Sequence, residues 1–460
     1  MGYPLPGLSM SRVRHGLTRG AGLLLILSVF ANGCRFKDRV AVPPDVAPTS
    51  SSSSSPDNDS VDQSILRTVP LVVATYRSIH EHPELGKQEV ETHDLLVSEL
   101  QRLGYRDFVT SSRLPTAVIA VLDSHRPGPT IALRSEMDAR KTQEPAGHSP
   151  RSKVDGLMHN CGHDAHAAIL LGVASVLKEQ ESTLRGRVVF LFQPAEETKG
   201  GADDVVAEGI LPRLGVRAIF AQHAAPGLPV GTVSISPGAT LAGSTTLSIL
   251  VHGRGSHAAM PWQGDDVPLA AAKIVQSLAD LPARRIDLLR RPTVISVAYI
   301  SAGDESSTNV LPTDAVIRGT VRSFEDIDHA EKGTAALRAD IEARIAGTTK
   351  AAGVTYDLKL EDGSPPTVND PQLFASLIPQ LQSSWPGVID TTPVRFMVSE
   401  DFAFYTKSIP ALYFGLGVER DGLGSAGVHS PEFTIHPAAL TEGVRLLALT
   451  ARTALSANTN

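Results

Sequence analysis

The segment that most constrains the fold is Val188–Phe192, a fully apolar run rich in β-branched and aromatic residues. A short run of this kind predicts a buried strand. The pattern of Ala165–Glu179 before it predicts a helix, and Ala218–Ala221 after it predicts another strand. Because strands and helices alternate along the chain, the sequence predicts an α/β fold.

The length of the chain, 460 residues, is sufficient for two or three domains. Within residues 237–352 the pattern changes to strand, helix, strand, strand and helix, which predicts a compact inserted domain. The α/β pattern then resumes and ends in a helix at Pro437–Leu455. We therefore expect a larger α/β domain in two parts, residues 61–236 and 353–460, interrupted by the inserted domain.

The N-terminus has the pattern of an export signal. Three arginines within residues 12–19 precede an apolar stretch, Ala21–Ala31, which is too short to cross a membrane as a helix. The segment that ends at Cys34 resembles a bacterial lipobox in which Cys34 is the lipidated residue. We therefore expect residues 1–33 to be the signal peptide of a lipoprotein, with simple secretion and cleavage near Gly33 as the alternative.

Residues 34–60 are rich in serine and proline and include a run of serines at Ser50–Ser55. Such a composition cannot form a core and predicts a flexible tether between the anchor and the first domain. No second apolar run in the sequence is long enough for a spanning helix. The expected location is therefore outside the cytoplasm, either periplasmic or held at the membrane only by a lipid on Cys34.

The charge and cysteine content exclude two classes of protein. The chain has 42 Lys and Arg against 49 Asp and Glu, a formal net charge of −7. A nucleic-acid-binding protein would show a basic face, so no nucleic-acid partner is expected. Two cysteines in the whole chain exclude a disulfide scaffold.

A dense group of metal-binding residue types precedes the helix predicted at Ala165–Glu179. Cys161 and His163 are two residues apart, so both can reach one pair of metal ions. A thiolate together with an imidazole suits zinc. Metal binding would also explain how Cys161 persists as a lone thiol outside the cytoplasm. For this cluster alone, a buried cysteine beside hydrogen-bonded histidines is the alternative.

Further polar side chains follow other predicted strands. Glu196 and Glu197 come soon after Val188–Phe192, and two carboxylates there are costly unless they bind or catalyse something. Ligands collect at this end of the strands in open α/β sheets. His223 ends the next strand, and His429 follows a glycine-rich loop. Considered singly, the acidic pair could belong to an exposed loop and each histidine could be structural.

Taken together, these residues supply enough ligands for two metal ions. The candidate ligands are Cys161, His163, Glu197, His223 and His429. Two adjacent metal ions polarise a carbonyl group and generate a hydroxide at neutral pH. Glu196 is left free to act as the general base. We expect two divalent ions, zinc in the first place, with manganese and cobalt as alternatives.

The ordered motifs resemble those of the dinuclear-metal aminoacylase/carboxypeptidase superfamily. The branch they resemble most is the amidohydrolase branch that includes hippurate and indole-acetyl-amino-acid hydrolases. The resemblance covers residues 65–455. The motifs that carry it are Ile79–Leu85, Leu133–Asp138, Cys161–His166, Gln193–Glu197, His223–Pro226, Ser256–Pro261, Asn309–Pro312, Ser399–Phe402 and His429–Pro431.

The resemblance implies a zinc-exopeptidase-like α/β/α catalytic domain with an inserted α+β, ferredoxin-like domain that serves as lid and dimerisation domain. By position, the five candidate ligands match the metal ligands of the superfamily, with Cys161 at the bridging place. Glu196 matches the general base. Asp138 matches the acid that orients a ligand imidazole.

Three residues of the inserted domain match substrate-binding positions of the superfamily. His257 and Asn309 match residues that help to bind the substrate carbonyl or carboxylate, often across a dimer. Arg322 matches an arginine that binds the substrate carboxylate. A contact in the lid core or in a dimer interface is the alternative for each of them. A homodimer is expected from the resemblance.

The function implied is metal-dependent hydrolysis of the amide bond of an N-acyl amino acid or a small peptide-like substrate. Glu196 would activate the attacking water as general base, and His257 would help to stabilise the oxyanion. A carboxypeptidase or dipeptidase with the same site is the first alternative. A non-catalytic lipoprotein that binds peptides or metal is the second.

One stretch departs from the pattern of the superfamily, which is usually Ala-Asp-Met-Asp-Ala-Leu-Pro. This chain has Ser135–Lys141 there, in which Asp138 is kept and Glu136 replaces Asp. Arg140 and Lys141 replace an apolar pair. A solvated loop is the plain explanation of the two cations, and a preference for acidic substrates is the sharper hypothesis.

Overall fold

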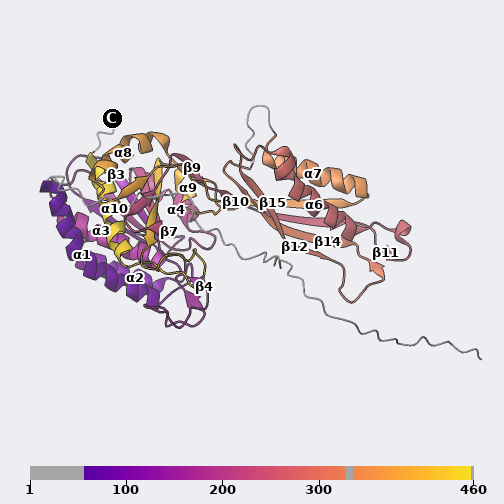
Figure 1. Cartoon of the computed structure of the whole chain (residues 1–460), viewed down its shortest axis with the longest axis horizontal. Helices are drawn as coiled ribbons and strands as arrows, with labels where there is room; N and C mark the ends of the chain where they lie inside the picture. The colour runs from indigo at the N-terminus through magenta and orange to yellow at the C-terminus, as the bar shows by residue number, and fades with distance from the viewer. Residues whose placement is uncertain (1–55, 328–334, 457–460) are drawn as a thin grey trace, which may run out of the picture. The chain divides into compact units, whose positions relative to one another are not determined.

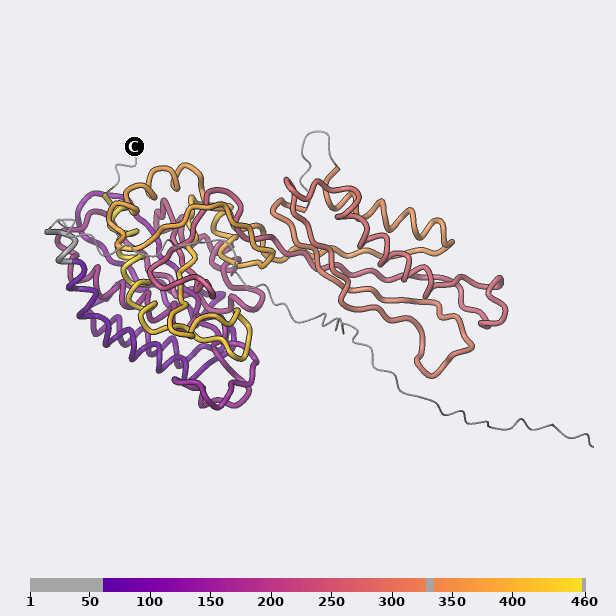
Figure 2. The backbone as a smooth tube through the Cα atoms, in the orientation of Figure 1, coloured from indigo at the N-terminus to yellow at the C-terminus, as the bar shows by residue number. Residues whose placement is uncertain are grey.

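The computed structural model describes residues 56–327 and 335–456 (Figures 1 and 2). The predicted signal peptide, Cys34 and most of the predicted tether lie outside these residues. Residues 56–60, the last part of that tether, belong to helix α1 (Pro56–Glu81). Within the described ranges, no helix has both the length and the apolar character needed to cross a membrane.

Eight strands of the described chain form one large mixed sheet, in the order β1-β2-β6-β3-β7-β18-β8-β17. They are β1 (Asp107–Val109), β2 (Val118–Asp123), β3 (Thr130–Glu136), β6 (Arg187–Gln193), β7 (Val216–Pro229), β8 (Thr232–Ser234), β17 (Val388–Asp390) and β18 (Ala411–Glu419). The four central strands, β6, β3, β7 and β18, run parallel to one another. The strands predicted within β6 and β7 are confirmed.

Helices cover both faces of this sheet, so alternate side chains of the central strand β6 enter two different cores. Val188, Phe190 and Phe192 point into one apolar core with α1, α2 (Val90–Arg102), α3 (His163–Glu179), α8 (Pro371–Ser384) and α10 (Ala438–Ser456). Val189 and Leu191 point into a second core with α4 (Ala202–Ala207), α5 (Ile210–Arg213) and α9 (Ala403–Thr406). Because successive side chains of a strand face opposite sides, a strand between two cores is apolar throughout. The predicted α/β/α architecture is confirmed.

Helix α3 is central to the first core because it packs against the sheet and against the helices α1 and α10. Its residues from His163 to Leu177 are all buried, so the helix is apolar on nearly every side. Gly172 marks the close approach of the helices: a Cβ there would lie 2.5 Å from Val72 of α1 and 2.9 Å from Val444 of α10. This packing fixes the N-terminal end of α3, where the candidate metal ligands begin.

A second sheet has the order β12-β14-β10-β15, with every neighbouring pair antiparallel. Its strands are β10 (Gly243–His252), β12 (Thr293–Ala302), β14 (Asp314–Ser323) and β15 (Thr355–Asp362), and its helices are α6 (Val267–Arg285) and α7 (Leu337–Ala352). The helices share one apolar core with the sheet. The order strand-helix-strand-strand-helix-strand is that of a ferredoxin-like domain, as predicted.

The smaller sheet extends beyond residue 352, where the sequence analysis placed the return to the larger domain. Gly353 has a φ of 73° and ends α7 in a left-handed conformation. The chain then enters β15, which pairs with β10 over its whole length. A helix-ending glycine marks a turn within the inserted domain here rather than the boundary of that domain.

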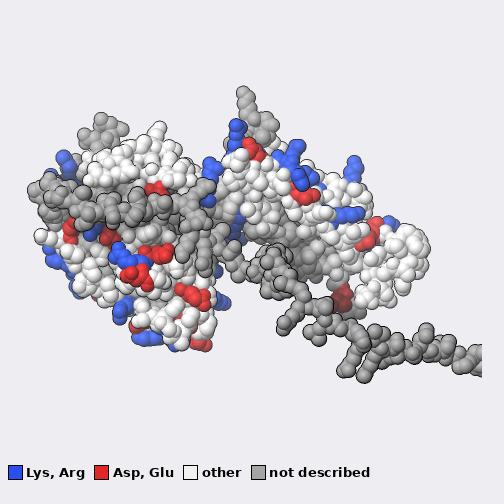
Figure 3. Space-filling view, in the orientation of Figure 1, with Lys and Arg blue, Asp and Glu red and all other residues white. Residues whose placement is uncertain are grey.

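Several short pairs of strands connect these elements. β4 (Arg140–Lys141) pairs with β5 (Leu157–Met158), β11 (Ser256–His257) with β13 (Val310–Leu311), and β9 (Gly238–Leu241) with β16 (Thr367–Asn369). A 3-10 turn, η1, covers Pro261–Gln263. Acidic and basic side chains are mixed on the face of the molecule shown in Figure 3.

Candidate functional site

The candidate site lies at the edge of the large sheet where its parallel strands end. β3 and β6 run side by side, with Glu136 opposite Gln193 at their last residues. The chain continues to Asp138 after β3 and to Glu196 and Glu197 after β6. Because parallel strands end at the same edge, three acidic side chains from distant parts of the sequence become neighbours.

The remaining candidate ligands reach the same place from other elements. Cys161 lies two residues before His163, the first residue of α3. Between them, Gly162 has a φ of 93°, a conformation that glycine adopts without steric cost. His223 lies within β7, and His429 follows β18.

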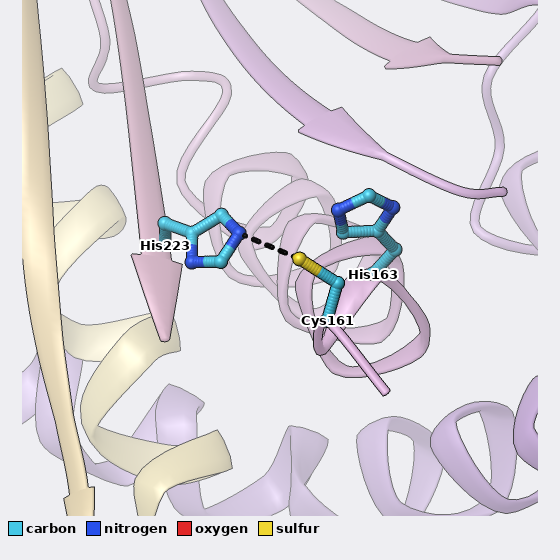
Figure 4. A group of neighbouring side chains, drawn as sticks. All are labelled: Cys161, His163 and His223. Atoms are coloured by element: carbon cyan, nitrogen blue, oxygen red, sulfur yellow. Dashed lines mark hydrogen bonds between the residues drawn. The ribbon is translucent and has the colours of Figure 1, made fainter. Parts of the chain in front are cut away.

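The side chains of these residues form two groups that share Cys161. Figure 4 shows the first group, Cys161, His163 and His223. Cys161 Sγ lies 3.4 Å from His223 Nε2, and the ligand atoms of Cys161, His163 and His223 all lie within 4.8 Å of one another. The same holds for Cys161, Glu197 and His429. His429 Nε2 is 2.9 Å from Glu197 Oε1. The structure thus brings together all five predicted ligands, with Cys161 common to both groups.

Asp138 holds two of these ligands in place. His163 Nδ1 lies 3.0 Å from the backbone oxygen of Asp138 and 3.2 Å from its Oδ1, and Asp138 Oδ2 accepts a hydrogen bond of 2.9 Å from the backbone N–H of Glu197. With Nδ1 engaged in this way, His163 directs Nε2 towards the cluster. Nε2 is buried and has no hydrogen-bond partner within the described part of the chain. A metal ion supplies the partner that such a nitrogen needs, so the residues present fit a metal centre.

Glu196 is held close to the cluster by a strained turn. Ala195 before it has a φ of 63° and donates its N–H to Glu89 Oε1 at 2.9 Å. Glu196 Oε2 lies 3.9 Å from His163 Nε2. Burial, together with the charges of Glu400 and Asp401, raises the pKa of Glu196 well above its usual range. A carboxylate with a raised pKa is suited to accepting and then returning a proton.

Glu197 has the opposite electrostatic environment from that of its neighbour. Burial favours a higher pKa, but the hydrogen bond to His429 and the charges of His163, His429 and Arg140 lower the pKa of Glu197 to about 2. Arg140 forms an ion pair with Glu197 Oε2. Adjacent carboxylates in such different environments favour different roles, Glu197 as an ionised ligand and Glu196 as a base.

A buried arginine near this site was missed by the sequence analysis. Arg134 of β3 is fully buried and donates hydrogen bonds to Glu400 Oε1 at 2.9 Å and to Asp401 Oδ1 at 2.6 Å. It also forms an ion pair with Glu136 and donates to Gln193 Oε1 at 3.0 Å. The available signal was an arginine within an otherwise apolar strand, which requires anionic partners in the interior.

Glu136 connects this arginine to a metal ligand through His166. The Nδ1 atom of His166 lies 2.7 Å from Glu136 Oε2, and its Nε2 accepts a hydrogen bond of 2.9 Å from the backbone N–H of Ala224. Burial and the charge of His163 lower the pKa of His166 to about 3, so the ring is neutral and can accept. The centre of the His166 ring lies 4.7 Å from the centre of the ring of His223, the residue before Ala224.

The three predicted residues of the inserted domain have different surroundings. His257 pairs with Val310 between β11 and β13, and the carbonyl of Asn309 accepts the N–H of Ala258 at 2.9 Å. Among the residues that the structure describes, no hydrogen bond or ion pair joins the side chain of His257 or Asn309 to the metal-binding groups. Arg322 of β14 donates to Ser399 Oγ at 2.6 Å, next to Glu400.

Comparison with known proteins places this site in a family. The model of peptidase family M20/M25/M40 matches residues 132–453. The IAA-amino acid hydrolase ILR1-like 4 of Arabidopsis thaliana is 38% identical over 383 residues, which are 82% of this chain and 83% of the relative. The N-acetyl-L-cysteine deacetylase of Bacillus subtilis is 32% identical over 391 residues, 84% of this chain and 89% of the relative.

A solved structure agrees with both the fold and the metal-binding prediction. The YxeP protein of Bacillus subtilis, described as a dinuclear metal-binding peptidase of the M20 family, matches with a TM-score of 0.73 and 30% sequence identity. The match covers 85% of this chain and 99% of that structure. The predicted superfamily and enzyme class are thereby confirmed, and the description of that structure as dinuclear supports the predicted pair of divalent metal ions. The chain belongs to peptidase family M20/M25/M40 and is a metal-dependent amidohydrolase.

Proposed function

We propose that this enzyme hydrolyses the amide bond of N-acyl amino acids. The observation that carries the proposal is the position of Glu196, a partly buried carboxylate with a raised pKa that lies 3.9 Å from the ligand nitrogen of His163. The two relatives described above are named for an amino-acid conjugate and for an N-acetylated amino acid, which supports this substrate class.

In the proposed reaction, two bound metal ions supply polarisation of the amide carbonyl and a lowered pKa for a bound water. Glu196 takes a proton from the attacking water and passes it to the leaving nitrogen. Asp138 keeps the imidazole of His163 oriented throughout. Arg322 and Asn309 bind the free carboxylate of the substrate, and His257 stabilises the oxyanion. Closure of the inserted domain as a lid would bring the last three residues to the substrate.

The metal that we propose is zinc. One thiolate, three imidazoles and a carboxylate make a donor set that suits zinc, and a set richer in oxygen ligands would favour manganese. Metal analysis of protein purified without added metal, followed by reconstitution with each ion, tests the assignment. Close to two zinc ions per chain is the expected result, and preferential retention of manganese or cobalt would contradict it.

The Glu196→Gln variant tests the proposed function directly. It keeps the size of the side chain but removes the base, so turnover of a panel of N-acyl amino acids should fall by about 10²–10⁴-fold or more. Metal content should stay at the wild-type value, because Glu197 rather than Glu196 is the proposed ligand. Retained activity would refute the role of Glu196.

The same panel separates the alternative functions. Dipeptides and C-terminally extended peptides included beside N-acyl amino acids would reveal a dipeptidase or carboxypeptidase by faster turnover. A non-catalytic binding protein is not favoured, because the chain belongs to a peptidase family and the site retains a base beside its ligand groups.

We further propose that the enzyme is a homodimer that pairs through the inserted domain. β12 is an edge strand of the smaller sheet, and Tyr299 and Ile300 on it are 51% and 50% exposed. Exposed apolar residues on a sheet edge favour pairing with another strand. Sedimentation of wild-type protein should give the dimer mass, and Ile300→Lys should shift it towards the monomer. A monomeric wild type at micromolar concentration would contradict the proposal.

We also propose export as a lipoprotein anchored at Cys34. The basic region, the apolar stretch Ala21–Ala31 and the lipobox-like segment support this location. Expressed in a bacterium, the wild-type chain should sediment with membranes, and Cys34→Ala should be released in soluble form. Equal distribution of the two proteins between the fractions would contradict lipidation.

A further inference from the structure

Arg140 belongs to a short strand that is fixed on both sides close to the metal ligands. β4 begins two residues after Asp138, and its partner β5 ends three residues before Cys161. Arg140 pairs with Met158, which is fully buried. The backbone N–H of the preceding residue donates to Glu84 O at 2.7 Å, which ties the strand to a third segment. The position of Arg140 is therefore determined by the same loops that position the metal ligands.

The guanidinium of Arg140 reaches the metal-binding groups and remains partly open to solvent. It forms an ion pair with Glu197 Oε2, and 34% of its side chain is exposed. Among the residues that the structure describes, Glu197 alone has a side chain that forms an ion pair with Arg140. Since a guanidinium has five N–H donors in a planar fork, most of them stay available to a ligand that enters from solvent.

Lys141 carries the same charge on the same strand but has different surroundings. Successive side chains of a strand point to opposite sides, and Lys141 is exposed. Within the described ranges, no carboxylate forms an ion pair with it. The structure therefore separates the two cations of this stretch: Arg140 faces the metal-binding groups and Lys141 does not.

We propose that Arg140 is a specificity-determining residue that selects substrates with an additional carboxylate close to the scissile amide. The inference rests on the proposed hydrolysis of N-acyl amino acids and adds a substrate class to it. Once Glu197 is engaged by a metal ion, the guanidinium can bind a substrate carboxylate through two parallel hydrogen bonds. That carboxylate has two sources, a dicarboxylic acyl group or an acidic amino-acid side chain.

The test compares matched substrates on the metal-loaded enzyme and three variants. N-acetylglutamate against N-acetylmethionine examines the amino-acid side chain, and N-succinylmethionine against N-butyrylmethionine examines the acyl group. In Arg140→Leu, the ratio of kcat/KM for the acidic over the neutral substrate should fall by at least about tenfold in one pair, equivalent to about 1.4 kcal/mol. The pair that responds identifies the source of the carboxylate.

Two further variants make the comparison specific. Arg140→Lys should retain part of the preference because it keeps the charge but loses the planar fork. Lys141→Leu is the matched control and should change either ratio by less than about twofold, as expected for an exposed charge that is screened by water. Unchanged ratios in Arg140→Leu, or equal losses in Arg140→Leu and Lys141→Leu, would overturn the inference.

A second readout does not depend on turnover. Because Arg140 holds Glu197 in an ion pair, Arg140→Leu should bind Zn²⁺ several-fold more tightly in a titration with a competing chelator, and Lys141→Leu should match wild type. An unchanged affinity for Zn²⁺ in Arg140→Leu would show that the charge of Arg140 does not act on Glu197, and it would overturn the inference. If wild type with two bound ions cleaves none of the four substrates, the proposed function fails as well; cleavage with unaltered ratios overturns the role of Arg140 alone.

Discussion

Asp138 hydrogen-bonds to His163 through a carboxylate oxygen that lies 3.2 Å from the ring nitrogen Nδ1. The other oxygen accepts the backbone N–H of Glu197, so one buried carboxylate sets the orientation of two metal ligands. A ligand imidazole that is fixed in this way keeps its free nitrogen directed at the metal and is more basic. Metal affinity should therefore depend on a residue that does not itself bind metal.

Asp138→Asn should weaken metal binding by about 10–100-fold, because the amide is a poorer acceptor for the imidazole N–H. Titration of the metal-free variant with Zn²⁺ in competition with a chelator measures the change. Asp155→Asn is a suitable control, since Asp155 is exposed. Equal affinities in wild type and Asp138→Asn would show that the contact with His163 has no effect on the metal.

Replacement of Arg134 by methionine should destabilise the enzyme strongly. Arg134 is fully buried between Glu400 and Asp401, and its removal leaves carboxylates in the interior without a counter-charge. Breaking a buried ion pair in this manner costs about 3–5 kcal/mol. Urea unfolding measures the loss.

Arg113→Met is the matched control for that measurement. Arg113 pairs with Asp204 at 3.1 Å, but 56% of its side chain is exposed, so the expected cost is about 0–1 kcal/mol. Similar losses for the two variants would mean that burial of Arg134 does not determine its contribution.

His80 should make the stability of the enzyme depend on pH. Burial favours a lower pKa for His80, but hydrogen bonds with Asp164 at 2.6 Å and Glu144 at 2.9 Å raise it to about 10. The pKa in the unfolded chain is about 6.5. Because the folded state binds the proton more tightly, the stabilisation is complete below pH 6.5 and is lost as the pH rises towards 10.

The variant His80→Gln removes this contribution, so its deficit in unfolding free energy against wild type should be largest near pH 6 and should shrink steadily up to pH 10. Urea unfolding at several pH values measures the deficit. His125→Gln, at an exposed position, should show no such trend. A deficit for His80→Gln that is independent of pH would contradict the raised pKa of His80.

Removal of metal should lower the melting temperature, because ions that bind only the folded state stabilise it. At a free metal concentration 100 times the Kd, the stabilisation is about 2.7 kcal/mol for one site. Calorimetry before and after treatment with a chelator measures the shift, and added Zn²⁺ should reverse it. His223→Ala should respond much less, since one of the ligand groups is then incomplete. An equal response in that variant would exclude His223 as a ligand.

Local sequence patterns were sufficient to predict the central strands and the candidate ligands. Val188–Phe192 is apolar because it lies between two cores, and that property is visible in the sequence itself. Cys161 and His163 are near neighbours in the chain, and Glu196 and Glu197 come soon after a strand. Each of these signals is contained within a few residues.

Features that depend on contacts between distant segments could not be predicted in the same way. The partners of Arg134 include Glu400 and Asp401, which lie on the far side of the inserted domain in the sequence. The pairing of β15 with β10 likewise joins the two ends of that domain. The ion pair between Arg140 and Glu197 depends on how β4 and β5 fold back towards the ligands. No local sequence pattern specifies these contacts.

The order of the ligands along the chain has a consequence for biosynthesis. Cys161, His163, Glu197 and His223 all precede the inserted domain, and His429 follows it, after the strand β18 that pairs with β7. A nascent or truncated chain that stops within the inserted domain carries most of the ligands but lacks the last one. The finished metal centre therefore distinguishes a chain that has been synthesised past His429 from every shorter fragment.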